Sequence, residues 1–340
     1  MNNALTYDDV LLVPQYSDIE SRSHVNIGSD LAPDIRLELP IISSPMDTVT
    51  EDQMAIEMHK AGGLGIIHRY NTIQDQVCLV ARVLLMDESI NIGAAIGMTG
   101  DFEERALALQ AVGVKILCID VAHGHHIMME RCLKTIKDRL AETIHVIAGN
   151  VATPEAFLAL AEWGADSIRV GIGGGSICST RLVSGHGMPT LQSVIDCAKS
   201  SSDVKIIADG GLKTSGDMVK ALAAGADFVM VGSMLAGTDE SPGEVFSNDA
   251  NKKYKVYRGM ASHSAQSDWR GKASTPEGIS TSIPYKGSVA SVLRDLAGGI
   301  RSGLSYSGAT SLKELRSKST FIRQSTAAQI ESSTHILRRD

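Results

Sequence analysis

The sequence predicts a (β/α)8 barrel (TIM barrel), and three observations support this fold class. Eight short apolar runs recur between residues 39 and 233, segments with helical spacing separate them, and a glycine follows several of the helical segments. Continuous apolar runs are typical of strands that are buried on both faces of a parallel sheet. Eight such strands alternating with helices form a barrel inside a ring of helices. A doubly wound open sheet is the alternative architecture.

The expected strands and helices alternate along the chain. We expect strands at residues 39–45, 64–68, 90–97, 115–122, 145–151, 167–173, 205–211 and 228–233. We expect helices at residues 51–61, 73–84, 103–112, 127–140, 154–163, 191–199 and 215–224. Thr153 and Thr214 are N-cap candidates, because a hydroxyl can accept a hydrogen bond from the free N–H groups at the start of a helix.

The composition is that of a soluble globular protein with one large domain, and we expect residues 1–340 to form it. Hydrophobic residues make up 43% of the chain and charged residues 21%. A net charge of −7 and an aromatic content of 4% argue against nucleic-acid binding. No apolar run is long enough to cross a membrane, and no signal peptide precedes Leu5.

Cysteine usage indicates a reducing compartment. The five cysteines are odd in number and widely spaced, with no CxxC pair: Cys78, Cys118, Cys132, Cys178 and Cys197. This pattern is typical of free thiols, and a disulfide framework or a zinc site would need closer pairs. We therefore expect a cytoplasmic protein.

A glycine-rich loop at residues 171–178 ends in Cys178, with Arg181 close behind it. Glycines let backbone N–H groups approach an anion, because no Cβ is in the way. A thiol at the end of such a loop is positioned to act as a nucleophile. The alternative is a flexible loop with a structural cysteine.

Polar residues stand where the expected strands end. Asp120, Asn150 and Asp209 each follow an apolar run, and glycines follow the runs at 205–211 and 228–233. Active sites of these barrels lie at the C-terminal ends of the strands, and the last two loops often hold a phosphate. The sequence therefore predicts a site for a phosphorylated ligand beside a cysteine nucleophile.

The alternating pattern breaks after residue 233. Residues 252–260 read as a β segment, and residues 261–276 are polar and weakly patterned, as expected for a mobile flap over the site. Helical spacing returns at residues 289–300 and 312–315, and the polar tail at 329–340 is expected on the surface or against a neighbouring subunit.

Nine segments together resemble the family of inosine monophosphate dehydrogenase and guanosine monophosphate reductase. They are LTYDDVLLVP (5–14), SSPMDTVTE (43–51), IAGNVAT (147–153), GIGGGSICSTR (171–181), IIADGG (206–211), VMVGSMLAGTDESPGE (229–244), YRGM (257–260), EGIS (277–280) and PYKG (284–287). The resemblance covers nearly the whole chain. It implies a purine nucleotide as substrate and a covalent adduct between Cys178 and C2 of the purine.

The resemblance also implies roles for individual residues. Thr180 and Glu277 would handle protons beside Cys178. The implied substrate-binding residues are Ser44, Met46, Ser176, Asp209, Gly211, Gly232, Ser233, Tyr257, Gly259, Met260 and Ala261. The implied cofactor-binding residues are Asp120, Ala122, Asn150, Gly171 and Arg181. A monovalent cation, K+ in particular, would be held by Gly173, Gly175 and Cys178 together with Glu331, Ser332 and Ser333 of a neighbouring subunit in a homotetramer.

Two features favour the reductase, which converts GMP to IMP and ammonia with NADPH. The dehydrogenase usually carries regulatory CBS modules between the second helix and the third strand, and residues 81–89 bridge that point directly. Its mobile flap carries an Arg-Tyr pair that activates water, and residues 260–277 contain no such pair.

The alternative is a dehydrogenase that oxidises IMP with NAD, since residues 5–14 and 257–260 are more similar to that enzyme and Arg270 is a candidate substitute for the flap arginine. Arg69 and Gly174 depart from the usual family pattern, which has lysine and proline there. A non-catalytic nucleotide-binding barrel is the third interpretation.

Overall fold

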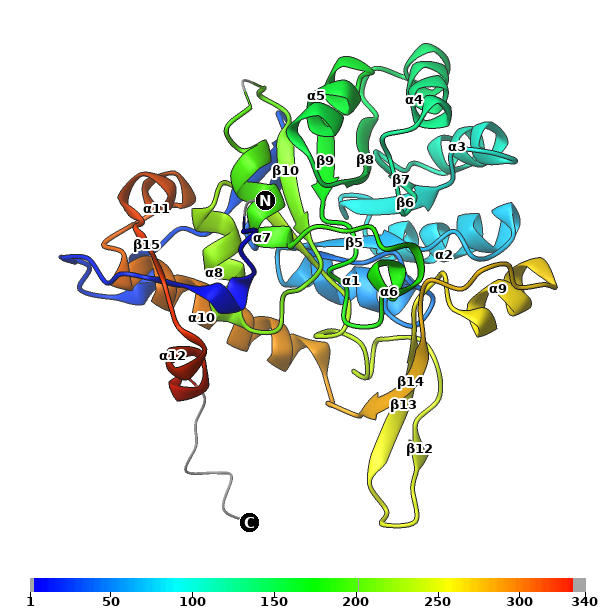
Figure 1. Ribbon diagram of the computed structural model, residues 1–340. Coiled ribbons are helices and arrows are strands. Elements are labelled where there is room, and N and C mark those ends of the chain that lie inside the picture. The colour runs from blue at the N-terminus through cyan, green and yellow to red at the C-terminus, as the bar shows by residue number, and fades with distance from the viewer. Residues whose placement is uncertain (1–2, 201, 333–340) are drawn as a thin grey trace.

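The computed structural model describes residues 3–200 and 202–332 and contains a closed barrel of eight parallel strands (Figure 1). In chain order the strands are β4 (Ile41–Ser43), β5 (Leu64–Ile67), β6 (Ile92–Ile96), β7 (Ile116–Asp120), β8 (His145–Val151), β9 (Ser167–Val170), β10 (Lys205–Asp209) and β11 (Phe228–Val231). The barrel closes where β11 pairs with β4. The fold class and all eight strand positions predicted from the sequence are confirmed, and the open sheet is excluded.

Helices surround the barrel as expected (Figure 1). They are α1 (Asp52–Lys60), α2 (Ile73–Met86), α3 (Phe102–Ala111), α4 (Ile127–Arg139), α5 (Pro154–Glu162), α6 (Thr180–Ser184), α7 (Thr190–Cys197), α8 (Ser215–Ala223), α10 (Val289–Tyr306) and α11 (Leu312–Lys318). The hydroxyls of Thr153 and Thr214 cap α5 and α8, and Thr214 forms a full capping box with Asp217. Both predicted N-caps are confirmed, and α10 and α11 run further than the sequence indicated.

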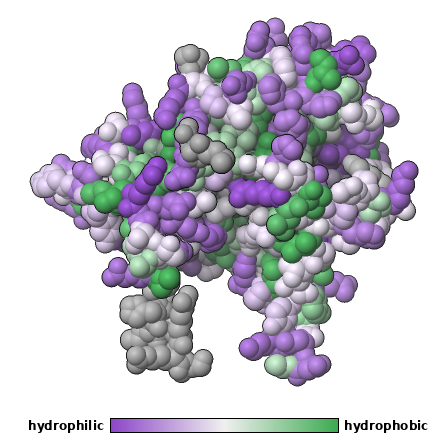
Figure 2. All heavy atoms as spheres, viewed as in Figure 1, coloured by the Kyte–Doolittle hydropathy of each residue, from purple (hydrophilic) through white to green (hydrophobic). Residues whose placement is uncertain are grey.

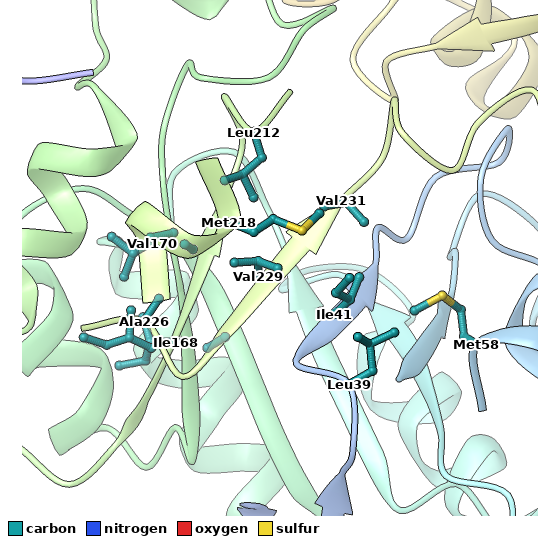
Figure 3. Close-up of a cluster of buried hydrophobic side chains, with 14 of the residues drawn as sticks. Leu39, Ile41, Met58, Ile168, Val170, Leu212, Met218, Ala226, Val229 and Val231 are labelled. Atoms are coloured by element: carbon teal, nitrogen blue, oxygen red, sulfur yellow. The ribbon is translucent and has the colours of Figure 1, made fainter. Parts of the chain in front are cut away.

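The strands bury apolar side chains on both faces. Ile42 and Phe228 point into the barrel, whereas Ile41 and Val229 belong to the layer between barrel and helices. In that outer layer Met58 of α1 lies near Ile41, and Met218 of α8 lies near Val229 (Figure 3). This double burial explains why the strands read as continuous apolar runs in the sequence.

A short hairpin closes the N-terminal end of the barrel. Strands β2 (Ser29–Ala32) and β3 (Ile35–Leu37) pair antiparallel just before β4 begins. Leu31, Ile35 and Leu37 are buried in the same apolar cluster as the side chains inside the barrel. The sequence analysis did not predict this hairpin, because its strands alternate buried and exposed residues and lack the continuous apolar run of the barrel strands.

The two ends of the described chain meet. Strand β1 (Val10–Leu12) pairs antiparallel with β15 (Phe321–Arg323). The short helices η1 (Tyr7–Asp9) and η2 (Arg22–His24) flank the first of these strands, and α12 (Thr326–Glu331) follows the second. The beginning of the expected surface tail at residues 329–340 is thus helical, whereas residues 333–340 lie outside the described part.

A small antiparallel sheet projects from the barrel after β11 (Figure 1). It consists of β12 (Phe246–Ser247), β13 (Lys253–Arg258) and β14 (Ser280–Pro284). Between β13 and β14 lies α9 (His263–Arg270), so the segment at 261–276, predicted as a weakly patterned mobile loop, contains a helix. Ser262 caps α9 by accepting a hydrogen bond from the Ala265 N–H. Within the helix, the side chains of Ala265 and Gln266 are buried.

Polar side chains cover most of the visible face of the molecule, and apolar ones gather near α6 (Figure 2). Leu182 of α6 is 90% exposed. Within residues 3–200 and 202–332, no helix is both long and apolar enough to span a bilayer.

Candidate active site

The Cys178 thiol lies directly beside the Thr180 hydroxyl, with 3.2 Å between Sγ and Oγ1. Cys178 is exposed, whereas Thr180 is buried at the start of α6. A nucleophile needs access to substrate, and a group that moves a proton must lie within hydrogen-bond reach of the reacting atoms. The pair meets both conditions.

Glu277 is brought to Cys178 by backbone pairing between two distant segments. The Ser179 N–H donates to the Glu277 carbonyl at 2.9 Å, and the Ile279 N–H donates to the Ile177 carbonyl at 3.0 Å. Cys178 and Gly278 form an isolated antiparallel bridge between these bonds. The three residues predicted as catalytic therefore lie together, although the two segments are far apart in the sequence.

One cavity of about 410 Å³ opens at the C-terminal ends of the strands. All the residues that the sequence assigned to substrate and catalysis line it: Ser44, Met46, Ser176, Cys178, Thr180, Asp209, Gly211, Gly232, Ser233, Tyr257, Gly259, Met260, Ala261 and Glu277. Six of the predicted cofactor and cation residues also line it: Asp120, Ala122, Asn150, Gly171, Gly173 and Gly175. Its volume is in the range of small-molecule sites.

Glycine is required where the loops after β9 and β10 touch. Gly171 has a φ of +146°, and a Cβ there would lie 1.9 Å from the Asp209 carbonyl oxygen. Gly210 has a φ of +91°, and a Cβ there would lie 3.1 Å from the backbone of Gly174. Only glycine fits both the dihedral angles and the space, so the backbones of these two loops lie in direct contact beside the cavity.

Tyr257 closes one side of the cavity. A Cβ on Gly232 would lie 3.1 Å from the Tyr257 hydroxyl, 3.2 Å from the Met46 sulfur and 3.4 Å from the Ser44 hydroxyl. Burial raises the pKa of Tyr257, and a hydrogen bond with Ser176 opposes that rise. The phenol is therefore a neutral hydroxyl at ordinary pH, able to donate a hydrogen bond to an anion.

Arg169 is a site residue that the sequence analysis missed. Its guanidinium donates to Asp120 and, through Nη2 at 2.8 Å, to Asp209, and all three side chains are largely buried. Burial by itself lowers the pKa of Arg169, but the carboxylates of Asp209 and Asp120 outweigh it and hold the pKa well above its usual value. A lone arginine inside the apolar run at 167–170 was the signal available in the sequence.

Asn150 joins this charged group to the glycine loop. Its side-chain amide donates to the Gly171 carbonyl and to Asp209, both at 2.8 Å. Its Oδ1 is buried and has no hydrogen-bond partner in the described part of the protein. A bound molecule with an N–H group would satisfy that acceptor.

Three predicted residues do not line the cavity of their own chain. Arg181 folds back over Gly173, and its Nη2 donates to the Met188 carbonyl at 2.7 Å, so it does not line the cavity as predicted. Glu331 and Ser332 lie at the end of α12, away from α6 (Figure 1). Ser333 lies outside the described residues, as does the side chain of Arg270. No group of three or more His, Cys, Asp or Glu side chains in the described part could hold a metal ion.

The fold and the residues at the barrel mouth define the class of protein, a (β/α)8-barrel enzyme with a cysteine in its cavity. The chain belongs to the family of IMP dehydrogenase and GMP reductase, because the model of the "IMP dehydrogenase / GMP reductase domain" matches residues 4–335. Members of this family are oxidoreductases that use NAD(P) cofactors.

Named relatives fall into both branches of the family. The chain is 39% identical to an inosine-5'-monophosphate dehydrogenase of Cryptosporidium parvum, covering 98% of this chain and 96% of that protein. It is 34% identical to a GMP reductase of Leishmania major, covering 97% and 96%. A crystal structure of a cysteine-to-alanine variant of GMP reductase from Trypanosoma brucei, in complex with guanosine 5'-monophosphate, superposes with a TM-score of 0.92 at 30% identity, covering 98% of both chains.

Chain length does not separate the two branches. The alignment with the Leishmania major GMP reductase runs over 475 positions, and that with an inosine-5'-monophosphate dehydrogenase of Nitrosopumilus maritimus over 469, against the 340 residues of this chain. Relatives with either name thus carry residues that this chain lacks. The direct bridge at residues 81–89 therefore carries less weight than the sequence analysis gave it.

Proposed function

We propose that this protein is a GMP reductase, which deaminates GMP to IMP and ammonia at the expense of NADPH. The observation that carries the proposal is the segment at 261–277. It brings Glu277 to Cys178 and Thr180, yet it contains no Arg-Tyr pair to activate water. A site with a proton-handling group but no water-activating arginine suits replacement of an amine better than hydrolysis.

The proposed chemistry begins with attack of the Cys178 thiolate on C2 of the guanine. The C2–N bond then breaks, and Glu277 and Thr180 deliver the proton with which the amine leaves as ammonia. A reduced nicotinamide, when bound, supplies the hydride that adds to C2. The C2–S bond then breaks, and Cys178 returns as a thiolate.

The residues present suit both ligands. The backbone amides at Gly171–Gly175 and Gly210–Gly211, with the neutral Tyr257 hydroxyl, suit a phosphate. The unpaired Oδ1 of Asn150 suits the carboxamide N–H of a nicotinamide. The Trypanosoma brucei relative was solved with GMP, which supports the same ligand here.

Absorbance at 340 nm tests the proposal in two cuvettes. A fall with GMP and NADPH, accompanied by ammonia release, is expected. A rise with IMP and NAD would instead identify the dehydrogenase, the second candidate, which is favoured by the identity to dehydrogenases of 35% and 39%. An unchanged absorbance in both cuvettes would favour a non-catalytic nucleotide-binding barrel.

Glu277→Gln separates proton handling from binding. We expect kcat for ammonia release to fall by about 10²-fold or more with little change in nucleotide affinity, because the amide cannot exchange a proton. Isothermal titration with GMP supplies the affinity. Equal losses in both quantities would assign Glu277 to binding alone.

A homotetramer with a K+ site completes the proposal. Gly173, Gly175 and Cys178 would supply carbonyl oxygens from one subunit, while Glu331, Ser332 and Ser333 would have to come from another. Activity should rise with K+ concentration, and light scattering should report four chains. A fully active monomer that is insensitive to K+ would contradict both points.

A further inference from the structure

The insertion at residues 262–276 has a narrow neck that forms part of the cavity wall. The Glu277 N–H donates to the Ala261 carbonyl at 3.0 Å, and both residues line the cavity. Gln266 fastens the loop from inside, donating to the Ala261 carbonyl at 3.0 Å and accepting from the Ser274 N–H at 2.9 Å. The insertion is therefore a closed unit attached at the Cys178 side of the site.

Helix α9 of the insertion is attached, through Arg258, to the loop after β4. Asp268 forms an ion pair with Arg258, and the same guanidinium donates to Asp47 through Nη2 at 2.6 Å and Nε at 3.0 Å. Asp47 follows the end of β4. A carboxylate on α9 is thus linked through one arginine to the loop after β4.

An aromatic contact provides a second, independent attachment. The rings of Trp269 and Tyr70 lie 6.3 Å apart at an interplanar angle of 54°, within the range of favourable aromatic pairs. Tyr70 follows β5 and lines the cavity, and the guanidinium of Arg69 lies 5.2 Å from the centre of its ring.

The strand order shows what the insertion crosses. Around the barrel, β10, β11 and β4 separate β9, which leads into the Cys178 loop, from β5, which leads into Tyr70. In a barrel of eight strands these are opposite sides. The insertion therefore connects the loop that carries the nucleophile with the Tyr70 loop.

We propose that Asp268 and Trp269 latch this insertion across the mouth, and that the latch determines whether water reaches the purine adduct on Cys178. The inference rests on the proposed reductase function for its chemistry. With the latch closed, the adduct persists after ammonia has left and awaits hydride. With the latch open, water adds to C2 and the C2–S bond breaks, releasing xanthosine monophosphate without any change of oxidation state.

The contacts are of a strength that suits a reversible latch. Asp268 is 65% exposed, so its ion pair with Arg258 is weak and screened by salt. A single aromatic pair adds a comparable amount. Loss of one contact should raise the open fraction a few-fold, and loss of both about tenfold.

Fluorescence tests the latch without any catalysis. The chain has two tryptophans, so Trp163→Phe leaves Trp269 as the only emitter. In that background Asp268→Asn should shift the emission to the red and raise acrylamide quenching about twofold, while Asp268→Glu should restore the parent values. Asp249→Asn, which removes an exposed carboxylate at the turn between β12 and β13, is the matched control. Unchanged quenching in Asp268→Asn would overturn the latch.

Product analysis with GMP alone tests the chemical consequence. The unaltered protein should release little xanthosine monophosphate, whereas Asp268→Asn combined with Trp269→Ala should release about tenfold more, with equal ammonia. Quenching that rises without xanthosine monophosphate would overturn the proposed control over water. If the unaltered protein forms no IMP from GMP and NADPH, the reductase function fails, and the fluorescence result still decides whether the latch exists.

Discussion

The two ends of the barrel are built from the same eight strands and have opposite chemistry. At the N-terminal end Leu31, Ile35 and Leu37 of the β2–β3 hairpin pack on apolar side chains inside the barrel. At the C-terminal end Arg169 lies between Asp120 and Asp209 beneath an open cavity. One end is sealed with apolar groups, and the other is lined with charge.

The change from apolar to charged side chains takes place within single strands. Strand β10 points Ile207 into the barrel and places Asp209 at the cavity, and β7 does the same with Cys118 and Asp120. On β7 both Ile116 and Cys118 belong to the apolar cluster inside the barrel, so more than one apolar residue separates Asp120 at the cavity from the hairpin. Substitutions at the two ends should therefore affect different properties, chemistry at one and stability at the other.

The largest effect is expected at the open end, from Cys178→Ala. Without the thiol no adduct forms, and turnover should fall by about 10³-fold or more while nucleotide affinity stays within a few-fold. A GMP turnover assay and a binding titration measure the two quantities. Residual turnover within tenfold of the unaltered protein would rule out covalent catalysis.

Arg169→Met should lower both catalytic activity and stability, although Arg169 lies at the open end of the barrel. It is therefore the exception to the rule that each end affects one property. It leaves two carboxylates buried without a counter-charge, which we expect to cost about 3–5 kcal/mol in the free energy of unfolding as well as most of the activity. Urea unfolding followed by circular dichroism gives the first quantity. A variant as stable as the parent would show that solvent reaches Asp120 and Asp209.

Ile35→Ala tests whether the apolar N-terminal end of the barrel affects stability without affecting catalysis. Removing a fully buried side chain should lower the free energy of unfolding by about 2–5 kcal/mol, with kcat unchanged at a temperature where the protein stays folded. Ile322→Ala, at a half-exposed position in β15, is the control. A large fall in kcat would mean that the two ends are coupled.

The smallest effect is expected within one pH unit below 6.5, from His145, the first residue of β8. Burial lowers the pKa of His145 to about 4, and the nearby Asp166 opposes that shift. Because the unfolded chain binds the proton near pH 6.5, stability is complete above that pH and falls as the pH drops toward 4, by at most about 1.4 kcal/mol per unit. His145→Gln should flatten this part of the stability profile. Identical profiles for both proteins would contradict the assignment.

Sequence patterns predict best those elements whose residues all share one environment along the chain. All eight strands were predictable because double burial demands continuous apolar runs, and the caps Thr153 and Thr214 obey local chemistry. The β2–β3 hairpin was not, because its strands alternate buried and exposed residues and therefore contain no continuous apolar run. Helix α9 was not predicted because its sequence is mostly polar, and of its described residues only Ala265 and Gln266 are buried.

The residues of the candidate site also fall into two groups, those that motifs indicate and those that only the fold reveals. Motifs indicated Cys178, Thr180 and Glu277, and the cavity contains all three. Arg169 escaped because its meaning depends on two carboxylates from other strands, which only the closed barrel brings together. Arg181 was assigned by resemblance to the cofactor side, and in the structure its guanidinium donates to the Met188 carbonyl of the same segment.

The pairing of β1 with β15 also bears on how the chain is synthesised. The N-terminal segment can dock as soon as the barrel emerges, since Leu5 bonds to Gln192 and the Tyr7 carbonyl accepts from Lys220. Val10, however, finds its partner only when Arg323 has left the ribosome. The pairing between β1 and β15 can therefore form only after all eight barrel strands have been synthesised, and a chain that ended before residue 321 would leave this edge of β1 unpaired.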